Sequence, residues 1–106
     1  DEVGKNDLCN PWISDLKKGT GTLLYNGAWN LFDQILVSQN MLDLTKKRDY
    51  SSLRYFKHQI FRRDYLFQTE GKYKGNPKRT HAGGQWLKGY ADHLPVIMYM
   101  LKEVTE

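Results

Sequence analysis

The sequence predicts an α/β (α+β) fold of mostly antiparallel strands with a helix or two. Three observations predict this class: a hairpin signature at Asn26-Gly27, apolar and aromatic runs at 52–61 and 94–101, and a short helical segment at 10–18. The chain has 106 residues and therefore forms at most one domain, and its net charge is +4. No apolar run approaches the roughly 18 residues that span a membrane, so we expect no transmembrane segment.

Residues 10–18 have the end signals of a short helix. Asn10 is a favoured N-cap, and Pro11 suits the first helical position because its missing N–H would have no partner there. Gly19 is a typical residue just after a helix end. We therefore expect one short helix before the first hairpin.

The clearest local signal is Asn26-Gly27 between two strand-like runs, 20–25 and 28–38. This pair favours a type I′ turn, which needs a positive φ at both positions. By the strand period of two, five residues of the second run share one face: Trp29, Leu31, Asp33, Ile35 and Val37. A carboxylate among apolar residues is costly unless something pairs with it, so we expect Asp33 to have a partner.

The rest of the chain alternates loops with two further strands. Residues 41–52 are polar and indicate a loop or frayed helix, 52–61 a strand, and 62–68 a helical turn. Residues 71–90 hold five glycines and one proline, which predicts a long irregular segment. Residues 94–101 are apolar on both faces, as expected of a final strand inside a covered sheet.

The irregular segment 71–90 is also basic, with no acidic residue. Its positive side chains are Lys72, Lys74, Lys78, Arg79 and Lys88. Such a field attracts phosphates, nucleic acid or anionic lipid, although a solvated surface loop is the alternative. Lys78 and Arg79 are candidates for phosphate contacts. Trp86 and Tyr90 are candidates for stacking on a base or sugar, with core packing as the alternative.

A second acid lies beside a histidine just before the final strand, at Asp92-His93. Neighbouring strand residues point to opposite faces, so the two share a site only where the strand begins, which is where Gly89 and Pro95 place them. A hydrogen bond from an Asp, for which Asp33 is the candidate, would fix the tautomer of the imidazole and raise its basicity. A structural histidine is the alternative.

These runs resemble the endonuclease/exonuclease/phosphatase superfamily of DNase I-like fold. Tyr90-Ala-Asp-His-Leu-Pro-Val96 resembles its closing Ser-Asp-His-x-Pro-Val motif, and Trp29-Asn-Leu-Phe-Asp-Gln-Ile-Leu-Val-Ser38 is similar to its penultimate motif. Lys78-Arg-Thr-His-Ala-Gly-Gly-Gln-Trp-Leu-Lys-Gly-Tyr90 resembles the preceding segment in a bacterial branch. The resemblance covers most of 7–101. It implies that residues 1–106 are the C-terminal portion of a four-layer α/β sandwich, without its N-terminal part.

The resemblance implies a role for each site residue. His93 matches the catalytic His, which acts as general base or transition-state stabiliser, and Asp33 matches the Asp that orients it. Asp92 matches the Asp that contributes to binding Mg²⁺ or Mn²⁺. The implied activity is metal-dependent hydrolysis of a phosphodiester or phosphomonoester. The implied substrate is a nucleic acid, a phospholipid, or a sugar or inositol phosphate.

The sequence departs from the family pattern in two ways. Ala91 stands where the motif has Ser. The family's Glu metal ligand, its early Asn and its Gly-Asp-x-Asn motif have no counterpart here, and we expect them in the N-terminal half of the domain, before Asp1. We therefore expect the complete protein to be a phosphoesterase and this fragment alone to be inactive. A periplasmic or secreted location fits the branch.

Two other functions remain open from the sequence. The first is a basic module that binds nucleic acid or another anion without catalysis. The second is a structural or interaction fragment in which Asp33, Asp92 and His93 form a buried hydrogen-bond network. The two differ from a hydrolase in that neither requires His93 to reach a substrate.

Overall fold

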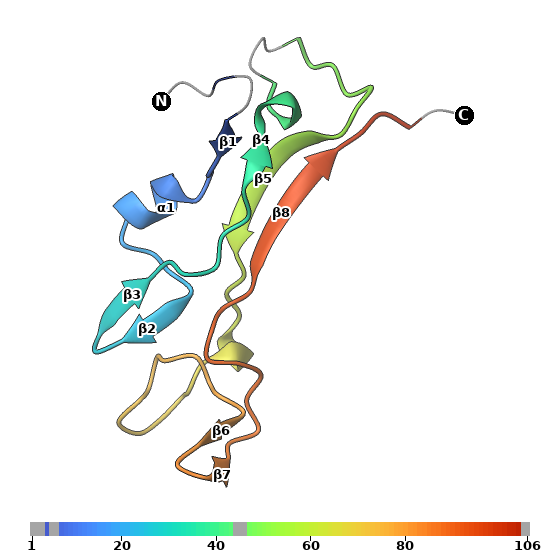
Figure 1. Cartoon of the computed structure of the whole chain (residues 1–106). Coiled ribbons are helices and arrows are strands. Elements are labelled where there is room, and N and C mark those ends of the chain that lie inside the picture. Colours follow the sequence, from blue (N-terminus) through green and yellow to red (C-terminus); the bar gives the residue numbers. More distant parts are fainter. Residues whose placement is uncertain (1–3, 5–6, 44–46, 105–106) are drawn as a thin grey trace.

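The computed structural model describes residues 4, 7–43 and 47–104, and these form mostly antiparallel strands with few helices, the predicted fold class (Figure 1). The helical elements are α1 (Ile13–Lys17), η1 (Gln39–Met41) and η2 (Asp64–Leu66). The strands are β1 (Leu8–Cys9), β2 (Leu23–Tyr25), β3 (Ala28–Asn30), β4 (Val37–Ser38), β5 (Arg54–Ile60), β6 (His81–Ala82), β7 (Gln85–Trp86) and β8 (Val96–Leu101). They pair as β1–β4, β2–β3, β5–β8 and β6–β7, each antiparallel.

The short helix and the first hairpin are confirmed, but α1 begins at Ile13 with Trp12 as its N-cap, so the predicted cap at Asn10 and first position at Pro11 are wrong. Before α1, the side-chain oxygen of Asn10 accepts a hydrogen bond from the Trp12 N–H at 3.0 Å, which satisfies one of the free donors of a helix start. In the β2–β3 turn, Asn26 has φ 49° and Gly27 has φ 77°, as a type I′ turn requires. The turn therefore sets the hairpin register, with Tyr25 opposite Ala28.

The predicted long strand over 28–38 is wrong. Strand β3 ends at Asn30, residues 31–36 are irregular, and β4 pairs with β1 instead of β2. Local side-chain hydrogen bonds replace the ladder there: the Asp33 N–H donates to Thr22 Oγ1 at 3.3 Å, and the Gln34 side chain donates to the Leu31 carbonyl at 2.6 Å. Asp33 consequently lies in a bent segment and not on an apolar strand face.

The longest pairing joins β5 to β8 and confirms the strands predicted at 52–61 and 94–101. Its register runs from Arg54 opposite Leu101 to Ile60 opposite Val96, with an irregularity between Tyr55 and Lys57. In Figure 1 the two strands form one long curved ribbon. The sheet was predicted to be covered, but in the described part of the chain Phe56 and Tyr99 remain exposed, because β5–β8 has only two strands.

Residues 71–90 are more ordered than predicted. Strands β6 and β7 form a hairpin around Gly83 and Gly84, whose φ angles of 57° and 78° few other residues adopt. The helical turn predicted at 62–68 is confirmed as η2. In the loop predicted at 41–52, residues 44–46 lie outside the described residues.

Few apolar side chains are buried. Among the described residues, those that are buried are Trp12, Leu31, Val37, Leu66 and Leu94. They come from separate parts of the chain, so the small core draws together the segment before α1, the segment between β3 and β4, β4 itself, η2 and the segment before β8. No helix in the described part of the chain is both long and apolar enough to cross a membrane.

Candidate active site

Asp33 and His93, which are 60 residues apart in the sequence, are in direct contact. His93 Nδ1 lies 2.6 Å from Asp33 Oδ2. An ionised carboxylate only accepts hydrogen bonds, so His93 carries its proton on Nδ1 and donates it to Asp33. In the neutral form of the ring this leaves a lone pair on Nε2, which makes no hydrogen bond with another described residue. The His93 and Asp33 side chains are 37% and 38% exposed, so this nitrogen faces a half-open site.

Thr22 anchors the Asp33–His93 pair through a hydrogen bond to the Asp33 carboxylate. It is completely buried, and its hydroxyl donates to the same Asp33 Oδ2 at 2.6 Å. Its carbonyl accepts from the Leu94 N–H at 2.7 Å, and its own N–H donates to the Asn30 carbonyl at 2.9 Å. Thr22 thus joins the β2–β3 hairpin to the two segments that carry the pair. Sequence reasoning missed it, because no local pattern distinguishes a threonine whose partners lie so far along the chain.

Asp92 is half-buried next to His93, but it makes no hydrogen bond or ion pair with the described residues. It lines a pocket of about 310 Å³ instead, which β2, the hairpin turn and the segment 68–82 enclose. In the described ranges no three His, Cys, Asp or Glu side chains gather to hold a metal ion. Asp92 therefore offers one free carboxylate and not a complete metal site.

The two candidate phosphate ligands differ in position. Arg79 lines the pocket beside Asp92, and its side chain makes no contact with another described residue. Lys78 does not line this pocket and is half-buried, while its backbone N–H donates to the Leu66 carbonyl at 2.7 Å. The structure therefore brings Arg79 to the candidate site and leaves Lys78 beside it.

Trp86 and Tyr90 are on the surface and not in the core. They are 67% and 68% exposed. The Lys88 ammonium lies 5.7 Å from the Trp86 ring centroid, and Tyr90 meets the edge of Tyr65 at 5.6 Å. Neither residue lines the pocket with Asp92. Both are thus exposed aromatic side chains outside the pocket that Asp92 lines.

A second histidine–carboxylate pair was not expected from the sequence. His58 Nε2 lies 2.6 Å from Asp15 Oδ2, and the Tyr55 hydroxyl donates to His58 Nδ1 at 2.6 Å. The centroid of the Trp12 ring lies 4.7 Å from that of the His58 ring. Burial, followed by the negative charges of Cys9 and Asp15, raises the pKa of the Tyr55 hydroxyl. Both ring nitrogens of His58 are occupied, so this network holds α1 against β5 and has no free base.

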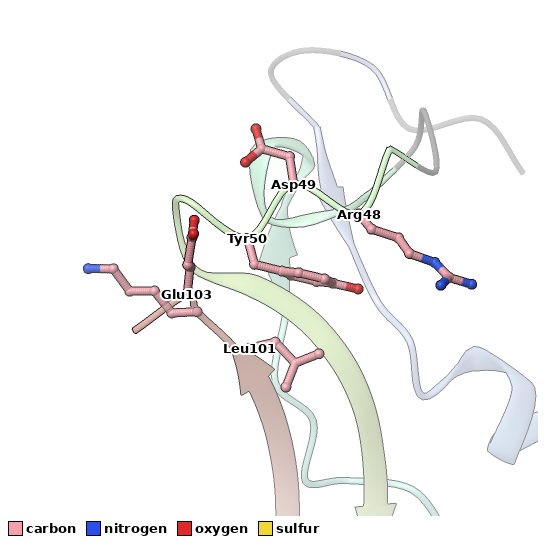
Figure 2. Close-up of a pocket in the computed structure, with 6 residues that line it drawn as sticks. Arg48, Asp49, Tyr50, Leu101 and Glu103 are labelled. Carbon is pink, nitrogen blue, oxygen red and sulfur yellow. The ribbon is translucent and has the colours of Figure 1, made fainter. Parts of the chain in front are cut away.

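A larger hollow, of about 430 Å³, lies at the opposite end of β8. Figure 2 shows its lining around Tyr50, with Arg48, Asp49, Leu101 and Glu103 at its walls. The hydroxyl and N–H of Ser51 lower the pKa of the exposed Asp49 carboxyl. His93 precedes the start of β8, so this hollow is separate from the Asp33–His93 pair.

The sequence was also compared with known proteins. It matches the profile of the Endonuclease/Exonuclease/phosphatase family over residues 1–102. No curated protein and no solved structure matches it. The family match covers nearly the whole chain, including the segments that hold Asp33, Asp92 and His93. The chain therefore belongs to the endonuclease/exonuclease/phosphatase family, whose activity is of the hydrolase type.

Proposed function

We propose that the protein is a metal-dependent phosphoesterase in which His93 acts as general base at the scissile phosphate. The observation that carries this proposal is the 2.6 Å hydrogen bond from His93 Nδ1 to Asp33, which in the neutral form of this half-exposed side chain leaves Nε2 as a hydrogen-bond acceptor. Such a nitrogen takes the proton of an attacking water when the two lie within hydrogen-bond distance. His58 is unsuited to this role, because both of its ring nitrogens are occupied.

Asp33 and Thr22 act as positioning residues in this proposal. The Asp33 carboxylate fixes the ring orientation and stabilises the imidazolium that forms when Nε2 takes a proton. The Thr22 hydroxyl donates to the same oxygen, so the carboxylate is held by two donors at 2.6 Å each. The buried position of Thr22 supports the arrangement, since its hydroxyl is shielded from competing water.

The first test is the variant His93→Ala, assayed for phosphoester hydrolysis in the protein as it occurs in nature. We expect turnover to fall by about 10² to 10⁴-fold, the usual contribution of a general base. The matched control is His81→Ala, because His81 is exposed in β6 and makes no side-chain contact with a described residue. Unchanged turnover in His93→Ala would refute the assignment. Absent turnover with salt-dependent nucleic-acid binding that survives the substitution would favour the binding module.

Metal dependence is the second part of the proposal, with Asp92 as one ligand of Mg²⁺ or Mn²⁺. A single carboxylate fits Mg²⁺ in part, because this ion is usually held by one or two carboxylates together with water and substrate phosphate oxygens. The free, half-buried carboxylate of Asp92 supports this. When bound, the ion would polarise the phosphoryl oxygen.

A titration with MnCl₂ tests the metal proposal without relying on activity. We expect the paramagnetic ion to broaden the amide resonances of residues 91–93 selectively, and Asp92→Asn to abolish this effect. Asp49→Asn is the control, because Asp49 is an exposed carboxylate at the far end of β8. Broadening that is centred elsewhere, or that persists in Asp92→Asn, would rule out Asp92 as a ligand.

We also propose that residues 1–106 form the C-terminal part of one catalytic domain and that the fragment alone is inactive. The small buried core supports this, since the described chain leaves large apolar residues such as Phe32 and Phe56 exposed. The N-terminal half of the domain is then the principal partner of this chain. The substrate, in this proposal, is a phosphate ester.

A further inference from the structure

The pocket beside Asp92 has the properties of a binding site for an organic group. It is about 310 Å³, which is at the lower end of the roughly 300–1,000 Å³ typical of ligand pockets. Its apolar walls are Leu23, Leu24, Pro77 and Ala82. In Figure 1 the β2–β3 hairpin tip lies over the loop between η2 and β6, and these two parts of the chain enclose the pocket.

Three amide side chains line the pocket and have no partner within it. Asn26 is in the hairpin turn, and Gln68 and Asn76 lie on opposite sides of the loop that follows η2. None of the three makes a side-chain hydrogen bond with a described residue, although Gln68 and Asn76 are half-buried. Each amide presents a donor and an acceptor side by side, so the pocket offers several unused hydrogen-bonding edges.

The remaining walls favour a flat, uncharged ring. Tyr25 and Tyr73 supply two aromatic rings, both largely exposed, and the Lys72 ammonium lies 5.5 Å from the Tyr73 ring centroid. Exposed aromatic faces of this kind stack on flat rings. Arg79 and Asp92 are the charged residues of the lining, one of each sign, so it carries no net charge. Such a lining does not attract a polyanionic group, as a strongly basic pocket would.

We propose that this pocket binds the base of a nucleoside phosphoester. A base edge accepts and donates hydrogen bonds in the paired pattern that Asn and Gln side chains match, and its faces stack on tyrosine rings. Asp92 lines the pocket and directly precedes His93 in the chain, so in this proposal the esterified phosphate of a bound base extends toward the Asp33–His93 pair. This inference rests on the proposed function, since it names the substrate class of the same site.

The test uses the protein as it occurs in nature and compares two esters with the same leaving group: adenosine 5′-(p-nitrophenyl phosphate) and methyl p-nitrophenyl phosphate. We expect Gln68→Leu to lower kcat/KM about tenfold for the adenosine ester, since one amide pair with a base is lost, and to leave the methyl ester unchanged. Gln85→Leu is the matched control, because Gln85 is exposed in β7 and outside the pocket. An equal loss on both esters would overturn the pocket assignment.

A binding measurement keeps the pocket assignment separate from the hydrolase assignment. We expect free adenosine to shift the ring resonances of Tyr25 and Tyr73 in the unmodified protein, and to shift them much less in Asn76→Ala. If neither ester is hydrolysed but adenosine shifts these rings, the proposed catalytic function fails and the pocket assignment stands. If adenosine leaves both rings unchanged, or if myo-inositol or methyl glucoside shifts them instead, the base assignment is refuted.

Discussion

At the scale of single residues, His93 and His58 show how the same side chain is committed to two different uses. Each donates to a carboxylate at 2.6 Å, but the second nitrogen of His58 accepts from Tyr55, while that of His93 is free. The His58 side chain is 15% exposed against 37% for His93. Burial and a full set of partners make His58 a structural link, whereas His93 keeps one hydrogen-bonding site for a substrate or water.

The raised pKa of Tyr55 makes stability depend on alkaline pH. The unfolded chain loses the phenolic proton near pH 10, and the folded chain holds it to a higher pH. The contribution of Tyr55 is therefore fully present below about pH 10, and it is lost as the pH rises through the folded pKa. We expect the difference in unfolding free energy between the wild type and Tyr55→Phe to shrink above about pH 10, as measured by urea titrations.

At neutral pH, the stability of Tyr55→Phe is compared with that of a control variant, Tyr25→Phe. Tyr55→Phe leaves His58 Nδ1 without its donor, so we expect a cost of about 1 kcal/mol at pH 7. Tyr25→Phe removes an exposed hydroxyl that has no partner among the described residues, so we expect a change within about 0.5 kcal/mol. A wild-type-minus-Tyr55→Phe difference that stays constant to high pH would contradict the linkage.

At the scale of elements, the β6–β7 hairpin is closed at its base by an unusually tight approach. The Leu87 N–H donates to the Thr80 carbonyl at 2.7 Å, and the Gly89 N–H donates to the Arg79 carbonyl at 3.1 Å. A Cβ at Gly89 would overlap the backbone carbonyl oxygens of Lys78 and Arg79. Only glycine allows these two backbone segments to approach so closely. The same contact fixes the backbone at Arg79 and lies three residues before Asp92.

We expect Gly89→Ala to open the base of this hairpin. The colliding atoms belong to the backbone and cannot turn aside, so the cost should be about 1–3 kcal/mol, as for other overpacked sites. Hydrogen exchange of the Leu87 amide reports the opening directly, and it should become faster. Ala91→Ser is the control, because Ala91 is exposed and two residues away, and exchange at Leu87 should be unchanged. Equal protection in Gly89→Ala and the wild type would show that the loop absorbs the methyl group.

Local sequence signals predicted those elements whose cause is local. The Asn26-Gly27 turn, the helix after Asn10 and the strands β5 and β8 follow from residues near one another in sequence. The strand predicted through 28–38 failed because Thr22 and Gln34 bond the backbone around Asp33, a competition that strand periodicity does not describe. The need of Asp33 for a partner was foreseen, although its supposed position on an apolar strand was wrong.

At the scale of the whole molecule, the described chain is extended. Its radius of gyration is 17.7 Å, whereas a compact domain of 100 residues has about 13 Å, and its dimensions are 51 × 36 × 20 Å. Each sheet has two strands, so both edges of every pair lack a neighbour within the described residues. This shape agrees with the proposal that residues 1–106 are part of a larger domain, whose other strands would cover the apolar faces.

Long-range contacts of the site could not be predicted from the sequence, because they join segments that are far apart in the chain. The network of Asp15, His58 and Tyr55 and the anchoring role of Thr22 join segments that no periodic pattern relates. The pocket beside Asp92 is likewise made of residues from the β2–β3 hairpin and from a loop far along the chain. Of its lining, only Arg79 and Asp92 were candidate site residues from the sequence. Residue types were readable from the sequence, but their meeting point was not.

The separation of Asp33 from His93 also has a consequence for the order of folding. The β2–β3 hairpin closes a two-residue turn and forms in microseconds, whereas β5 and β8 pair across a long stretch of chain. Because the entropy of closing a loop opposes distant contacts until they are made, nonlocal pairing is the slow step. We therefore expect Thr22 to be positioned early, with the hairpin. The hydrogen bond from the Leu94 N–H to the Thr22 carbonyl then forms later, together with the contact between His93 and Asp33. We therefore expect the Asp33–His93 hydrogen bond to form late in folding.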